Sequence, residues 1–184
     1  MNKQIQFALA GLVVAAIVLA GFYFLYWVPH QTPPAPAEPI HWHADFKVYL
    51  DNNAFDFSQS KYQSVEGNEL SERIHLHEND GNVIHIEGAD VLLGEFFNSI
   101  GMKFSSTCFV TDTNKSYCDG AAGQLKFFVN GQINTQFENY VPQDLDRILI
   151  AYGNETPEQL QQELDSVTDN ACIESGKCPE RGTP

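Results

Sequence analysis

The chain has 184 residues, a formal net charge of −14 and 43% hydrophobic residues, among them 13 Phe and 7 Tyr. This length suits one domain with additional segments, and the apolar content excludes a wholly disordered chain. Only 10 Lys and Arg stand against 24 Asp and Glu. A basic surface that binds phosphate groups is therefore not expected, and we do not expect the protein to bind nucleic acid.

The first hydrophobic stretch, residues 5–28, contains no charged side chain. About 20 such residues are enough to cross a bilayer as a helix. Trp27 suits the headgroup layer at the end of such a helix, and Pro29 then ends it. The pattern predicts a transmembrane helix over residues 5–28, with a cleaved signal peptide as the alternative.

The positive charges predict how this helix is oriented. Lys3 and the amino terminus precede it, and the next cation is Lys47. By the positive-inside rule, residues 1–4 are cytoplasmic and the following domain is extracytoplasmic. Residues 29–40 are rich in proline and predict an extended spacer. The expected localisation is the cell membrane, as a single-pass protein that contacts the bilayer through its N-terminal helix.

Residues 41–153 alternate apolar and polar side chains, which is typical of β-strands. A first hairpin is expected around Asn52-Asn53, with Leu50 opposite Phe55. A second is expected around residues 79–81. The segment thus begins as two antiparallel strand pairs.

A helix is predicted over residues 89–100, with Gly101 as its end. A hairpin at Asn130-Gly131 and a last strand from residue 147 follow. The expected fold class is α+β: a transmembrane helix, then a small mixed sheet with one packed helix. Its element order is β-grasp-like, and a β-sandwich is the alternative.

The C-terminal segment, residues 154–184, predicts a short helix and a polar tail. Thr156 as N-cap, Pro157 at the first helical position and Gln159 in a capping box mark the start of the helix. The tail after Asp169 contains two Cys and offers little to bury.

Four cysteines outside the cytoplasm indicate disulfides. Local closure costs the least entropy, which favours the pairs Cys108–Cys118 and Cys172–Cys178 over the two other pairings. Neither pair has the C-x-x-C spacing of thiol redox enzymes. Structural disulfides are therefore the expected role.

Histidines form the most informative pattern. Five of the six fall within one stretch, mostly spaced two residues apart: His41, His43, His75, His77 and His85. This spacing places neighbouring side chains on one face of a strand, and the other face is apolar in each segment. The imidazoles should therefore lie on the sheet face away from the main core. His30 falls in the spacer and is taken as incidental.

The turn between the strand with His75 and His77 and the strand with His85 sets the register of this pair. A three-residue loop with Gly81 in the left-handed conformation pairs His75 with His85 and His77 with Val83. His75 and His85 would then be about 5 Å apart at Cβ, which is close enough to share one metal ion.

Four or five converging imidazoles predict a metal site, and we expect the metal to be Cu or Zn. Asp45, Glu78 and Glu87 are the candidate carboxylates that would orient the imidazoles. Two other interpretations remain open: hydrogen-bonded structural histidines, and a pH-sensing cluster.

The expected function is a membrane-anchored, extracytoplasmic metal-binding module for metal capture, delivery or electron transfer. One alternative is a thiol–disulfide oxidoreductase or isomerase that uses Cys172 and Cys178. Another is a cofactor-free module that binds an unknown partner in the cell envelope. The sequence contains no G-x-S-x-G, no H-E-x-x-H and no Gly-rich phosphate loop, so an enzyme is the less favoured class.

Five segments resemble a poorly characterised family of membrane-anchored, extracytoplasmic His-rich proteins of archaea and bacteria: HWHADFKVYL, IHLHENDGNVIHIE, LLGEFFNSIG, LKFFVNG and DRILIAYG. The similarity covers about residues 41–153. Some relatives are labelled protein-disulfide isomerase-like, and this chain lacks the C-x-x-C that such an activity needs. The resemblance implies anchoring outside the cytoplasm and no particular activity.

Overall fold

The structure is a computed structural model that describes residues 2–27, 40–65, 67 and 69–178. The chain divides into two compact units, residues 1–38 and 39–184. The predicted proline-rich spacer, residues 29–40, lies outside the described residues except for Ile40.

The first unit is a single long helix. α1 (Lys3–Phe22) continues into the π-helical turn η1 (Tyr23–Trp27). Together they form a helix that is long and apolar enough to cross a membrane, and none of its described side chains is buried. A membrane anchor and a signal sequence share this length and composition.

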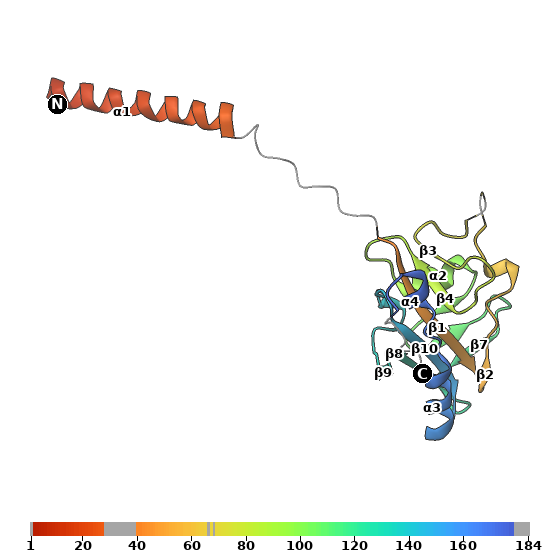
Figure 1. The fold of residues 1–184 in the computed structure, drawn as a ribbon. Helices are drawn as coiled ribbons and strands as arrows, with labels where there is room; N and C mark the ends of the chain where they lie inside the picture. The colour runs from red at the N-terminus through yellow and green to blue at the C-terminus, as the bar shows by residue number, and fades with distance from the viewer. Residues whose placement is uncertain (1, 28–39, 66, 68, 179–184) are drawn as a thin grey trace. The chain divides into compact units, whose positions relative to one another are not determined.

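Two parallel strands form the centre of the second unit. β1 (Trp42–Leu50) pairs with β10 (Arg147–Gly153), and Asp45 lies opposite Arg147. The strand order is β3-β4-β1-β10-β8-β9, and β2 also pairs with β1 (Figure 1). All the other pairings are antiparallel, and they involve β2 (Asn53–Ala54), β3 (Ile74–His75), β4 (Val83–Ile86), β8 (Gln124–Val129) and β9 (Gln132–Ile133).

One face of this mixed sheet forms the main core. It packs against α2 (Leu93–Ser99) and a second, three-stranded sheet of β5 (Lys103–Phe104), β6 (Cys108–Val110) and β7 (Ser116–Cys118). Edge-to-face aromatic pairs join the layers: Phe46–Phe96 at 5.4 Å, Phe97–Phe109 at 5.1 Å and Phe104–Phe127 at 5.7 Å between ring centroids. Such pairs add to the stabilisation from burial. The α+β class is confirmed.

The opposite face is covered by the C-terminal segment. α3 (Pro157–Ser166) packs on β10, and α4 (Ala171–Glu174) packs on β1. A smaller apolar cluster lies under α3, with Leu149 and Ala151 of β10 and Val167 after the helix. Odd-numbered residues of β1 also point to this face. His43 of β1 therefore shares this face with α4.

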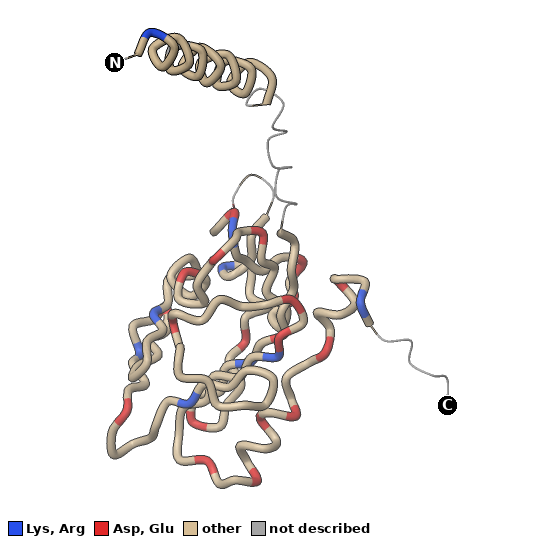
Figure 2. Tube along the Cα trace, turned by 90° about the vertical axis from the view of Figure 1, so that its left-hand side faces the viewer, with Lys and Arg blue, Asp and Glu red and all other residues tan. Residues whose placement is uncertain are grey.

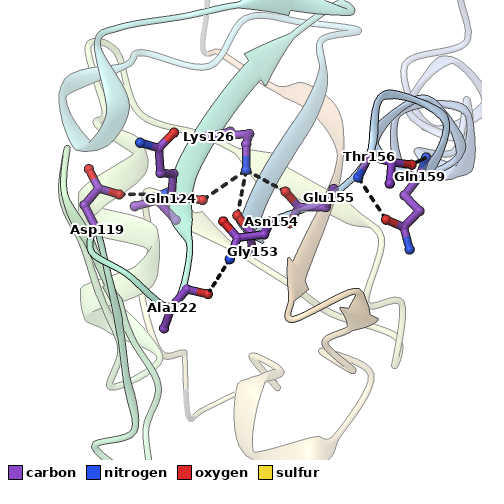
Figure 3. A network of polar contacts seen from close by, with 10 residues as sticks. Asp119, Ala122, Gln124, Lys126, Gly153, Asn154, Glu155, Thr156 and Gln159 are labelled. Carbon is purple, nitrogen blue, oxygen red and sulfur yellow. Dashed lines mark hydrogen bonds and ion pairs between the residues drawn. The ribbon is translucent and has the colours of Figure 1, made fainter.

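A polar network fixes the start of α3 on the sheet (Figure 3). Lys126 of β8 donates hydrogen bonds to the carbonyl oxygens of Gln124 and Gly153 and to the carboxylate of Glu155. The predicted capping box is present, since Gln159 N donates to Thr156 Oγ1 at 3.3 Å and Thr156 N donates to Gln159 Oε1 at 2.9 Å. The predicted helix start is confirmed.

The first predicted hairpin has a different register. Leu50 pairs with Asn53 and not with Phe55, because the loop consists of Asp51 and Asn52. Both loop residues have left-handed φ angles of 52° and 61°. Asp and Asn tolerate this conformation, which a two-residue type I′ turn requires at both positions.

For the second predicted hairpin, the pairing of His75 with His85 is confirmed and the predicted turn conformation is wrong. His75 lies opposite His85, as expected, but β3 ends at His75, so His77 does not pair with Val83 in the ladder. The left-handed residues are Glu78 and Asn79, not Gly81. Gly81 is needed for another reason: a Cβ there would lie 2.6 Å from Ser58 N.

The predicted helix over residues 89–100 is shorter in the structure. α2 begins at Leu93, because Asp90 has a left-handed φ of 53° and Leu92 is extended. Gly101, with φ 77°, ends it as predicted. The Asn130-Gly131 turn between β8 and β9 also forms, with φ angles of 53° and 76°.

The expectation that the tail buries little is wrong. Ala171 and Cys172 are buried against the sheet. The carboxylate of Asp45, itself buried in β1, accepts hydrogen bonds from the Thr168 hydroxyl and from the backbone N–H groups of Asn170 and Ala171, the latter two at 2.9 Å. A buried acid in the sheet thus holds the start of α4.

Two disulfides are present, with the pairing expected from the sequence. Cys108–Cys118 joins directly opposed positions of β6 and β7, and Cys172–Cys178 joins α4 to the segment that follows it. Acidic residues are spread around the unit and basic residues are few (Figure 2). Such a surface attracts cations.

We expect Asp45→Asn to destabilise the protein by about 3 kcal/mol, because an amide replaces one acceptor oxygen by an NH₂ group that faces backbone donors. Thermal and chemical unfolding of the full chain in detergent measure the loss. Asp51→Asn is the matched control, since this exposed turn residue has a conformation that Asn also adopts. An equal loss in both variants would contradict the role given to Asp45.

The buried carboxyl of Glu163 in α3 has no hydrogen-bond partner among the described residues. Burial, together with the nearby Glu155 charge, raises the pKa of Glu163 to about 7. The folded protein therefore holds this proton more tightly than the unfolded chain, and its stability falls as the pH rises from about 4.5 to about 7.

Glu163→Gln removes this dependence and should be more stable than the wild type by on the order of 1–3 kcal/mol at about pH 8, with a smaller difference at about pH 5. Urea unfolding at both pH values tests this, with the exposed Asp165→Asn of the same helix as control. If the stability difference between Glu163→Gln and the wild type does not increase with pH, the pKa of Glu163 is not raised in the folded protein.

Candidate metal centre

Three histidines of the sheet form a group that can hold a metal ion. One ligand nitrogen from each of His41, His43 and His85 lies within 4.8 Å of the other two. His43 is directly opposite His85 in the β1–β4 ladder, and His41 lies just before β1 on the same face. Their ring centroids are 4.5 Å apart for His43–His85 and 4.8 Å for His41–His43. The β1–β4 register therefore brings His43 and His85 together, and His41, one residue before β1, continues the alternation on the same face.

The other two predicted ligands lie beside this group. His77 Nε2 is 3.0 Å from His85 Nδ1, so one of these two nitrogens donates a hydrogen bond to the other. The His75 ring is stacked on that of His85 at 6.0 Å, and its Nδ1 contacts Ser71 O at 3.0 Å. All five imidazoles thus gather around His85, and three of them offer a common ligand position.

Burial divides the three ligands. His43 and His85 are 2% and 4% exposed, whereas His41 is exposed. Two imidazoles are therefore fixed in the protein, and the third faces solvent. An incoming ion or an exchanging ligand can reach the group from the side of His41.

Ser175, at the end of α4, is a hydrogen-bond partner of the His43 ring. His43 Nδ1 lies 2.8 Å from Ser175 Oγ, and Ser175 donates to Asp144 Oδ1 at 2.7 Å. Asp144 also accepts hydrogen bonds from His43 N, at 3.1 Å, and from Lys177. Burial alone would raise the pKa of Asp144, but the hydrogen bonds from Lys177 and Ser175 hold it below its usual value.

This geometry determines the tautomer of His43. The Ser175 hydroxyl has one proton, which it donates to the ionised Asp144, so it must accept from the Nδ1–H of His43. The lone pair of His43 is then on Nε2. A neutral imidazole with its other nitrogen anchored in this way is the usual form of a metal-ligating histidine.

Burial also keeps the central imidazoles neutral. Desolvation, with contributions from His77 and His43, lowers the pKa of His85 to about 3. Burial and the neighbouring His41 lower the pKa of His43 as well. Neutral imidazoles keep the lone pair that a metal ion requires, so His43 and His85 are ready to bind at neutral pH.

The three predicted carboxylates have different roles. Glu87 Oε1 lies 3.8 Å from His41 Nδ1, and Glu78 Oε1 lies 4.0 Å from His77 Nδ1. Asp45 does not contact the imidazoles, because its carboxylate is used by the start of α4. Sequence reasoning missed Asp144 and Ser175, and no spacing pattern connects either residue with His43.

The chain matches no family model, no curated protein and no solved structure. The chemical interpretation of the centre therefore rests on its own residues.

We expect the His85 ring to stay neutral between about pH 7.5 and pH 5, because its pKa is lowered to about 3. The side-chain ¹³C and ¹⁵N shifts of His85 in the metal-free protein measure this, with free histidine as an internal reference that titrates near pH 6.5. A His85 titration that follows the reference would contradict the burial of the site.

Proposed function

We propose that the protein is an extracytoplasmic module that binds a Cu or Zn ion through His41, His43 and His85 and is anchored to the membrane by its N-terminal helix. The observation that supports this most directly is the His43–Ser175–Asp144 chain. It leaves Nε2 of a buried histidine unprotonated, beside two further imidazoles.

The donor set favours Cu or Zn over harder cations. The group offers three imidazole nitrogens, and all four cysteines are bonded in disulfides. Imidazole suits both metals, and three histidines with an open fourth position are a known zinc arrangement. Copper binds nitrogen sites most tightly among the divalent first-row metals.

The exposed side of the group supports metal capture and delivery as the role. His41 is exposed, so a donor or acceptor of the ion can approach while His43 and His85 hold it. Disulfides persist in oxidising compartments, which supports a location outside the cytoplasm. The apolar helix and the resemblance to anchored extracytoplasmic proteins support a membrane anchor.

We expect the full chain in detergent to bind one equivalent of Zn²⁺ or Cu²⁺, and His43→Ala and His85→Ala each to weaken binding by at least about 100-fold. Competition with a chromophoric chelator measures both affinities. His30→Ala is the control, since it removes a histidine of the spacer, and it should change the affinity by less than about 3-fold. A wild-type protein that takes up neither metal at micromolar concentration would overturn the proposal.

A further inference from the structure

A covalently closed loop brings Ser175 to His43. The disulfide Cys172–Cys178 spans six positions and encloses Ser175 and Lys177. Ser175 Oγ contacts His43 Nδ1 at 2.8 Å, and Lys177 pairs with Asp144. The group that orients a candidate metal ligand thus depends on a segment that a disulfide restrains.

The two ends of this segment are held in different ways. Before Cys172, the Asp45 carboxylate accepts hydrogen bonds from Asn170 N and Ala171 N, so the start of α4 stays on β1 without the disulfide. After Cys172, the side chains of Ile173 and Glu174 are exposed. Ser175 contacts His43 of β1 and Asp144, and Lys177 contacts Asp144, which lies in the segment before β10. Within the segment, Ser175 N donates to Ala171 O at 2.9 Å and Lys177 N donates to Cys172 O at 2.8 Å. The disulfide closes this same short turn, so it restrains Ser175 together with these backbone hydrogen bonds.

We propose that the Cys172–Cys178 disulfide is a redox-dependent latch on the metal site. The oxidised form holds Ser175 against His43, and the reduced form releases it and lowers metal affinity. This inference rests on the proposed function, since it concerns the regulation of the same centre. It makes Ser175 a positioning residue and not a metal ligand.

The reductant is a dithiol of the thiol–disulfide exchange class. Its thiolate attacks Cys178, which is half-buried, whereas Cys172 is 4% exposed. A mixed disulfide forms with Cys178, and Cys172 leaves as the thiolate. The second thiol of the reductant then displaces Cys178 and closes its own disulfide. Two electrons and two protons pass from the dithiol to the protein.

The expected effect follows from the hydrogen bond that is lost. Without Ser175, the Nδ1–H of His43 has no fixed acceptor, so the ring can rotate or carry its proton on Nε2, which then cannot bind a metal. Loss of such an outer partner weakens metal binding by roughly 10–100-fold.

The test compares Zn²⁺ affinity between two disulfide variants of the full chain in detergent. The double variant Cys172→Ser/Cys178→Ser opens the latch without creating thiols that would themselves bind zinc. Cys108→Ser/Cys118→Ser is the matched control, because it removes the disulfide between β6 and β7, on the other layer of the fold. We expect a loss of roughly 10–100-fold in the first and less than about 3-fold in the second.

Ser175→Ala keeps both disulfides and removes only the hydroxyl group, so it tests the latch even where a disulfide variant folds poorly. We expect it to lose as much affinity as Cys172→Ser/Cys178→Ser, and the triple variant to lose no more, because both changes break the same contact. Full additivity of the two losses would overturn the proposal.

The His43 tautomer in the zinc-free protein is a second readout, measured from its side-chain ¹⁵N shifts. We expect the Nδ1–H form in the wild type and in the control variant, and a mixture when the latch is open. Unchanged affinity and tautomer in Cys172→Ser/Cys178→Ser, or equal losses in both disulfide variants, would overturn the latch. A wild type that takes up neither Zn²⁺ nor Cu²⁺ overturns the proposed function, and the tautomer still decides whether the disulfide holds Ser175.

Discussion

β1 and β10 lie side by side and parallel at the centre of the sheet, with Asp45–Leu50 in register with Arg147–Tyr152. A parallel pair cannot be closed by a tight turn, so all the elements from β2 to η4 (Phe137–Asn139) form the connection between these two strands. The aromatic core packs on one face of this strand pair, and α3 and α4 pack on the other. The position of the histidine group follows from this pairing, because β1 presents His43 to the face that the C-terminal segment covers.

Local rules predicted a large part of this arrangement. The alternation of residues in β1, β3 and β4 predicted which face holds the histidines, and the pairing of His75 with His85 followed from it. The α3 capping box and the Asn130-Gly131 turn depend on neighbours within three residues, so sequence spacing alone determines them. The predicted register of the hairpin after β1 is wrong, because Asp51, Asn52 and Asn53 all suit a turn and only tertiary packing selects two of them.

Long-range contacts could not be predicted in this way. His43 meets Asp144 and Ser175 across separations of 101 and 132 residues, and no pattern in a single sequence links such positions. The same limit applies to Asp45, a polar residue of the histidine face whose acceptor role depends on where the tail docks. Polar partners of this kind depend on the docking of distant segments, whereas apolar alternation is a property of each strand by itself.

The separation between His43 and Ser175 also sets an order of events during synthesis. If the protein is anchored and exported as we propose, His41 and His43 reach the outer compartment early, because they follow the N-terminal helix closely in the chain. β10, which pairs with β1 from Asp45 onward, and the loop that contains Ser175 follow about a hundred residues later. Closing such a long loop is entropically costly. A partly translocated chain can thus expose all its histidines and still lack the arrangement that orients His43. High-affinity metal loading would then report that the chain has been fully exported, folded and oxidised.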